Sequence, residues 1–187
     1  MIPWEEADDG FLYFMSIDGT HCPINEPRPF SKKNSSYKLG GSAGVNYEIG
    51  LQINRNRLLW IYGPTKPGET NDLGVFHRSL KGKFQAFRQT KGERLIVADG
   101  IYAPETDLIA TSNNFDPPEL AKFKDRVSAR HEFFNHYVKE YNIFKTKFHH
   151  KDDTKHTFHG RCFRAACAVI MFELDNESIH LFDPYPV

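Results

Sequence analysis

The sequence predicts an α/β fold in which a mixed sheet is flanked by helices. Two patterns support this prediction: short β-prone runs dominate the first half of the chain, and helical periodicity dominates from Pro118 onward. The length of 187 residues, with 40% hydrophobic and 26% charged side chains, is typical of one globular domain with a sizeable core. We therefore expect a single domain over residues 1–187, with residues 1–10 as a short N-terminal arm.

Three strands joined by short turns are expected first, as an antiparallel meander. The apolar run at residues 11–17 predicts a buried strand that ends at Asp18, where an Asp-Gly pair is typical of a turn. Residues 36–53 are β-prone, with glycines that indicate a bend or a bulge. Residues 57–62 predict a third strand, which Gly63-Pro64 closes.

A helix and two further strands are expected next. Asn71 or Asp72 can cap a helix that runs to about Phe87. Residues 94–98 predict a fourth strand followed by Asp99-Gly100, and residues 107–111 are a candidate fifth. This order is compatible with the ribonuclease H-like arrangement among other α/β folds.

Two helices are expected in the last third of the chain. The first starts at Pro118, and its apolar positions are Phe133, Tyr137, Tyr141, Phe144 and Phe148. The last covers about residues 156–174, and its apolar side consists of Phe158, Cys162, Ala165, Ala166, Val169 and Ile170.

Three carboxylates stand where this fold could bring them together. Asp18 and Asp99 each end an apolar strand, and strand ends are where ligands collect in α/β sheets. Glu132 lies on the long helix, in a polar stripe with Asn135, His136 and Lys139. Each carboxylate also has an ordinary interpretation, as a turn former or as an exposed helix residue. Together they predict a site for Mg²⁺ or Mn²⁺, and two such ions can cleave a phosphodiester.

The charge distribution does not by itself predict a nucleic-acid-binding protein. There are 24 basic and 24 acidic side chains, so the formal net charge is zero. Local basic runs occur at residues 28–38 and 145–164, and either a solvated face or a DNA contact would explain them. The candidate DNA-binding residues are Lys32, Lys33, Lys38, Lys139, Lys145 and Lys147.

Four stretches resemble the DDE superfamily endonucleases, the catalytic domain of Harbinger-like and related transposases. They are IDGTH, PGETNDLGVF, VADGIYAP and ARHEFFNHYVKEYNIF, they occur in the order of the family, and KHTFHGRCFRAACAVIMFELDNESIHLFDP is similar to its closing helix and tail. The resemblance implies a ribonuclease H-like fold and two-metal phosphodiester cleavage with Mg²⁺ or Mn²⁺. It implies Asp18, Asp99 and Glu132 as the catalytic, metal-binding residues, and Asp72 as a supporting aspartate.

Other polar residues carry weaker hypotheses. His21 could touch the scissile phosphate or a ligand carboxylate, or make a structural hydrogen bond, and Arg130 could contact DNA or pair with an acid. The histidines at positions 149, 150, 156 and 159 lack the spacing of a zinc site, so a solvated or DNA-facing loop is the better interpretation. Trp60 is expected in the core, and Trp4 against the first strand.

The setting of the protein follows from the same features. Three cysteines without metal-site spacing indicate a reduced, intracellular compartment, and the resemblance implies the nucleus, with the cytoplasm as an alternative. No apolar run approaches the length of a membrane span. DNA is the expected partner, and a homo-oligomer is left open.

The function has two competing interpretations. Related transposases carry a DNA-binding region ahead of the catalytic domain, and no recognition-helix candidate precedes Asp18. We therefore expect either a fragment that needs a missing N-terminal domain or a separate DNA-binding protein, or a domesticated copy. The first interpretation is a metal-dependent endonuclease or transposase catalytic domain. The second is a catalytically idle protein-interaction module.

Overall fold

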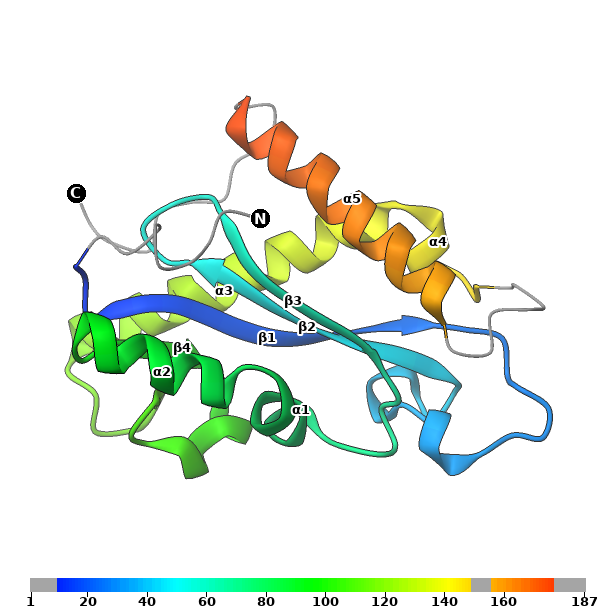
Figure 1. The fold of residues 1–187 in the computed structure, drawn as a ribbon, viewed down its shortest axis with the longest axis horizontal. Coiled ribbons are helices and arrows are strands. Elements are labelled where there is room, and N and C mark those ends of the chain that lie inside the picture. Colours follow the sequence, from blue (N-terminus) through cyan, green and yellow to red (C-terminus); the bar gives the residue numbers. More distant parts are fainter. Residues whose placement is uncertain (1–9, 149–155, 177–187) are drawn as a thin grey trace.

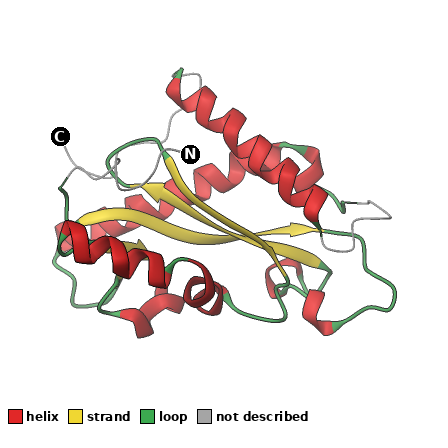
Figure 2. Ribbon diagram, viewed as in Figure 1, coloured by secondary structure: helices red, strands yellow, loops and turns green. Residues whose placement is uncertain are grey.

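The computed structural model describes residues 10–148 and 156–176, and it confirms an α/β fold with a mixed sheet flanked by helices (Figures 1 and 2). The described strands form one five-stranded sheet in the order β3-β2-β1-β4-β5. Their bounds are β1 (Tyr13–Pro23), β2 (Gly44–Gln52), β3 (Leu58–Thr65), β4 (Leu95–Ala98) and β5 (Ile109–Thr111).

The sheet is antiparallel on one side of β1 and parallel on the other. β1 pairs with β2 and β2 with β3 in antiparallel register, which confirms the order and direction of the predicted meander. The predicted short turn between the first two strands is wrong, because residues 24–43 join β1 to β2. β4 pairs with β1 and β5 with β4 in parallel register. The parallel pairs require crossover connections, and these are supplied by the helical segments between β3 and β4 and between β4 and β5.

The helices lie on the two faces of the sheet (Figure 1). Those of the described residues are α1 (Asp72–Ser79), α2 (Lys81–Lys91), α3 (Pro118–Glu140), α4 (Asn142–Lys145) and α5 (Thr157–Asp175), with 3₁₀ turns η1 (Lys32–Asn34), η2 (Tyr37–Leu39) and η3 (Gly100–Glu105). Phe76, Phe84 and Phe87 of α1 and α2 pack with Ile17 of β1 on one face. On the other face, α3, α4 and α5 share a core with β2.

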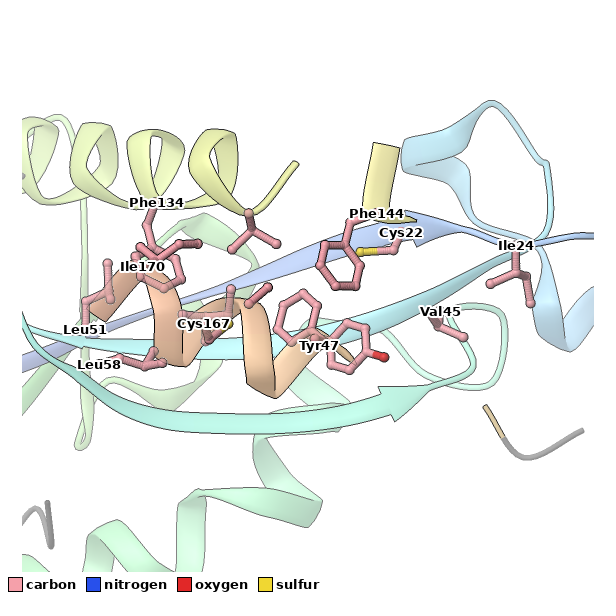
Figure 3. Close-up of a cluster of buried hydrophobic side chains, with 14 of the residues drawn as sticks. Cys22, Ile24, Val45, Tyr47, Leu51, Leu58, Phe134, Phe144, Cys167 and Ile170 are labelled. Carbon is pink, nitrogen blue, oxygen red and sulfur yellow. The ribbon is translucent and has the colours of Figure 1, made fainter. Parts of the chain in front are cut away.

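Figure 3 shows the core on the α3 and α5 face. Tyr47 of β2 stacks on Phe163 of α5 with ring centroids 3.7 Å apart. Its hydroxyl lies 2.6 Å from Nδ1 of His159, which is also buried. These contacts join the middle of β2 to the first two turns of α5, so they fix which side of that helix faces the sheet.

Several predicted elements need correction at their ends. β1 does not end at Asp18 but continues to Pro23, because β2 pairs with it along its whole second half. β2 begins only at Gly44, since η2 occupies part of the predicted strand at residues 36–53. β3 runs past Gly63-Pro64 to Thr65, and the helix predicted after Asn71 is divided at Leu80.

The apolar faces predicted for the two long helices were only partly right. Ala166 and Ile170 are buried as predicted, whereas Phe144 is buried in α4 rather than in the long helix. In α3, Phe134 is fully buried and Phe133 is 46% exposed, so the helix is turned by one residue from the predicted orientation. In α5, Phe158 and Val169 are exposed. The buried side of α5 instead consists of His159, Gly160, Phe163, Ala166, Cys167, Ile170 and Leu174. Both helices carry adjacent apolar residues, and periodicity alone cannot choose between neighbouring apolar stripes.

Candidate functional site

Asp18 and Asp99 come from neighbouring parallel strands. β1 pairs with β4 through Ser16 and Val97, and β4 ends one residue later at Ala98. Because parallel strands advance in step, this register brings Asp99 to the level of Asp18. The expected convergence therefore arises from the end of β4 alone, since Asp18 lies in the middle of β1.

The Asp18 carboxylate is held by two donors. Asn135 of α3 donates its side-chain N–H to Oδ2 of Asp18 over 3.0 Å. The backbone N–H of Gly19 donates to Oδ1 over 2.7 Å. The bond to Asn135 shows that Asp18 points to the face of the sheet that α3 covers. Asp18 is half-buried, so a small ligand can still reach its carboxylate.

Asp99 is fixed by the turn that follows β4. Its Oδ1 accepts a hydrogen bond from the backbone N–H of Ile101 over 2.9 Å, so the carboxylate caps the 3₁₀ turn η3. Burial raises the pKa of Asp99, the Ile101 N–H works against this, and the nearby charge of Asp18 raises the pKa further. The net result is a raised pKa, and the contribution of Asp18 reflects how close the two aspartates lie.

A pocket of about 150 Å³ opens where these strands meet α3. Its lining consists of Ile17, Asp18, Val97, Ala98, Asp99, Val127, Ser128, His131 and Glu132. All three predicted carboxylates thus lie on the wall of one pocket, contributed by β1, the end of β4 and α3. Asp99 and Glu132 are exposed at its mouth, and Asp18 lies deeper.

Only part of the polar stripe predicted on α3 faces the pocket. Glu132 lines the pocket and Asn135 bonds to Asp18, but His136 is exposed and lies 3.3 Å from the carboxylate of Glu140. Sequence reasoning missed His131, which is buried and lines the pocket. Burial lowers the pKa of His131, while the charge of Asp18 works in the opposite direction. The ARHE motif, which contains His131, does not indicate that this side chain points inward. Its direction depends on which face of α3 packs on the core, and the buried Phe134 defines that face.

The three carboxylates of the pocket are suitable ligands for a hard divalent cation, although their side chains do not converge on one point. Carboxylate oxygens on three sides of a pocket are the ligands that Mg²⁺ and Mn²⁺ prefer. Within residues 10–148 and 156–176, no three His, Cys, Asp or Glu side chains form a group that could hold a metal ion as they lie. Binding therefore requires rotamer changes. The exposed Glu132 can make them at little cost, whereas Asp99 must either keep its hydrogen bond to the Ile101 N–H or give up the cap of η3.

Asp72 supports β1 from the opposite face of the sheet. An added Cβ at Gly19 would lie 2.5 Å from Oδ1 of Asp72, so only glycine lets this carboxylate approach the strand. The glycine of IDGTH thus serves a close approach rather than a turn. Burial raises the pKa of Asp72, but three neighbours outweigh it and lower the pKa to about 2. They are the His21 ring, with Nε2 3.9 Å from Oδ1, and the side chains of Lys38 and Asn46, which donate hydrogen bonds to the carboxylate.

His21 and Arg130 both have structural contacts. Nδ1 of His21 lies 2.5 Å from the hydroxyl of Ser36, and both residues are buried. Arg130 is 1% exposed and donates to the carbonyls of Gln52 and Ile53 over 3.0 and 2.7 Å. Arg130 therefore fastens α3 to the β2–β3 loop, where it is shielded from solvent. DNA could not reach it without displacing that loop.

The predicted DNA-binding lysines lie in different settings. Lys32, Lys145 and Lys147 are exposed, Lys139 is half-buried, and Lys33 lies 3.4 Å from Glu69. Lys38 instead reaches inward to the Gly19 carbonyl and to Asp72.

The predicted histidine loop needs correction at His159, which is buried in α5, whereas positions 149 and 150 lie outside the described residues. Trp60 is half-buried and donates to Glu48 over 2.8 Å, and Trp4 also lies outside the described residues. No helix in the described part of the chain is long and apolar enough to span a bilayer.

Comparison with known proteins gives one match. The family model described as DDE superfamily endonuclease matches residues 17–170. Neither the curated proteins nor the solved structures searched contain a match to this chain. The mixed five-stranded sheet with flanking helices is consistent with a ribonuclease H-like fold, the fold of a DDE nuclease.

Proposed function

The chain belongs to the DDE superfamily endonucleases, and from this premise we propose that it is a Mg²⁺- or Mn²⁺-dependent DNA endonuclease of the Harbinger-like transposase group, acting from the nucleus. The observation that carries the proposal is that Asp18, Asp99 and Glu132 line the same pocket. These three residues are proposed as the catalytic carboxylates, and the family implies DNA as the substrate.

The residues around the pocket have clear tasks under this proposal. Asn135 and the Gly19 N–H orient the Asp18 carboxylate, and the Ile101 N–H orients that of Asp99. Glu132 closes the site from α3, which Arg130 holds against the β2–β3 loop. When bound, two divalent ions would activate the attacking water and stabilise the leaving oxygen of the phosphodiester.

Local charge supports the need for more than one cation. Three ionised carboxylates around one pocket would repel a phosphodiester, and the charge of Lys38, which acts on both Asp18 and Asp99, offsets only part of this repulsion. A single divalent ion would leave the pocket close to neutral. A second would make it positive enough to attract the DNA backbone.

Metal binding can be tested without any assay of cleavage. Titrating Mn²⁺ should raise the melting temperature of the wild type by several degrees, because the ion binds only the folded state. Asp99→Asn should abolish most of that rise, while Asp107→Asn, a control that lies outside the pocket lining, should preserve it. An equal rise in the wild type and in Asp99→Asn would place the metal elsewhere.

A further inference from the structure

The edge of β1 beside Asp18 is completed by side chains. β4 pairs with β1 only as far as Ser16. Beyond that point, the N–H of Gly19 donates to Asp18, and its carbonyl accepts a hydrogen bond from Nζ of Lys38 over 2.9 Å. Asp18 and Lys38 are thus attached to the two polar groups of one residue, so they lie close together on the same edge of the strand.

The Lys38 ammonium is held by a second, buried partner. Its Nζ lies 3.1 Å from Oδ2 of Asp72, a side chain that is only 4% exposed. The other oxygen of Asp72 accepts a hydrogen bond from Asn46 over 2.9 Å. Asp72 is therefore a fixed anion, anchored to β2 beneath Gly19, and it cannot follow the ammonium if Lys38 moves.

Two carboxylates compete for this ammonium. Burial lowers the pKa of Lys38, but the charges of Asp72 and then Asp18 outweigh burial and raise it. The Lys38 side chain is 31% exposed and has a flexible stem, so its head can move within the site. If Asp72 lost its charge, Asp18 would become the strongest remaining attraction, and an ammonium on Asp18 would compete with a metal ion for the same oxygens.

We propose that Asp72 is a positioning residue that holds Lys38 at the margin of the carboxylate pocket, and thereby keeps Asp18 open to a divalent cation. The inference rests on the proposed metal site. It adds that the Asp72–Lys38 pair, on the opposite face of the sheet, keeps this site accessible. Asp72 acts through Lys38, so the loss of Mn²⁺ affinity caused by replacing Asp72 should be reversed when Lys38 is replaced as well. A residue that merely stabilised the fold would not show this dependence.

The test measures Mn²⁺ affinity by the EPR signal of the free ion in folded protein. Asp72→Asn should weaken Mn²⁺ binding about fivefold, the effect of an ion pair worth roughly 1 kcal/mol that the metal must now displace. The double variant Asp72→Asn/Lys38→Met should bind Mn²⁺ at least as tightly as the wild type. The matched control Asp72→Asn/Lys33→Met removes an exposed lysine from the same segment and should remain as weak as Asp72→Asn.

Each outcome decides the matter. Wild-type affinity in Asp72→Asn, or a double variant with Lys38→Met that stays weak, overturns the inference and leaves the metal site intact. A wild type that binds no Mn²⁺ overturns the metal site and the inference with it. If circular dichroism shows Asp72→Asn to be unfolded, Lys38→Met alone decides: unchanged or tighter Mn²⁺ binding supports the inference, and weaker binding overturns it.

Discussion

Each of the single variants Asp18→Ala, Asp99→Ala and Glu132→Ala should lower Mg²⁺-dependent nicking of supercoiled DNA about a thousandfold or more. Every anionic ligand contributes to the charge that holds the ions, so one neutral substitution disables the whole site. Combining the substitutions should therefore cause little further loss, as is usual for groups that act as a unit. Because the formal net charge is zero, DNA affinity is expected to be weak, and the assay belongs at low salt and high protein concentration.

The control for this experiment is an acid on the same helix as Glu132. Asp125 is exposed on α3 and does not line the pocket, so Asp125→Ala should nick DNA at the wild-type rate. Nicking that persists in the triple variant would come from a contaminating nuclease. A folded wild type that nicks no DNA with Mg²⁺ or Mn²⁺, even when fused to a basic helix-turn-helix module, would favour the idle interaction module instead.

Arg130→Met should cause the second large effect, a loss of about 3–5 kcal/mol in the free energy of unfolding. The guanidinium is buried, and its N–H groups donate to carbonyls of Gln52, Ile53 and Arg55. Methionine keeps much of the volume but supplies no donor, and each buried acceptor that loses its partner costs about 1–3 kcal/mol. Urea unfolding followed by circular dichroism measures the change.

Arg126→Met provides the comparison for Arg130, because it removes an exposed arginine one turn earlier on α3. It should change stability by no more than about 0.5 kcal/mol. An equally small effect of Arg130→Met would mean that α3 is held to the β2–β3 loop by apolar packing alone. At temperatures where Arg130→Met begins to unfold and the wild type does not, nicking should also fall, because α3 carries Glu132.

Much of the sheet and of the site could be predicted from local patterns. The cluster of β-prone runs, the Asn71 cap and the strand before Asp99 depend on neighbouring residues, and the structure confirms them. The second half of β1 could not be predicted in this way. His21 and Cys22 are not a local strand signal, and the strand continues because β2 pairs with it.

The orientation of the helices was the other feature that sequence could not supply. Phe133 and Phe134 are adjacent and equally apolar, so only packing against the core decides which is buried. That one-residue difference brings His131 into the pocket and leaves His136 in solvent. The motif alone predicts Asp72 as a supporting residue, but its place beneath Gly19 depends on a contact between residues 53 positions apart.

The proposed function depends most on Asp18, Asp99 and Glu132 together binding the divalent cation. Anomalous diffraction from a crystal soaked in Mn²⁺ tests it directly, because the ion is located without reference to activity. We expect anomalous density inside the pocket, within about 2–2.5 Å of carboxylate oxygens of Asp18 and Asp99, with Glu132 turned toward it. Density confined to other carboxylates, with this pocket left empty at saturating Mn²⁺, would contradict the proposed metal site.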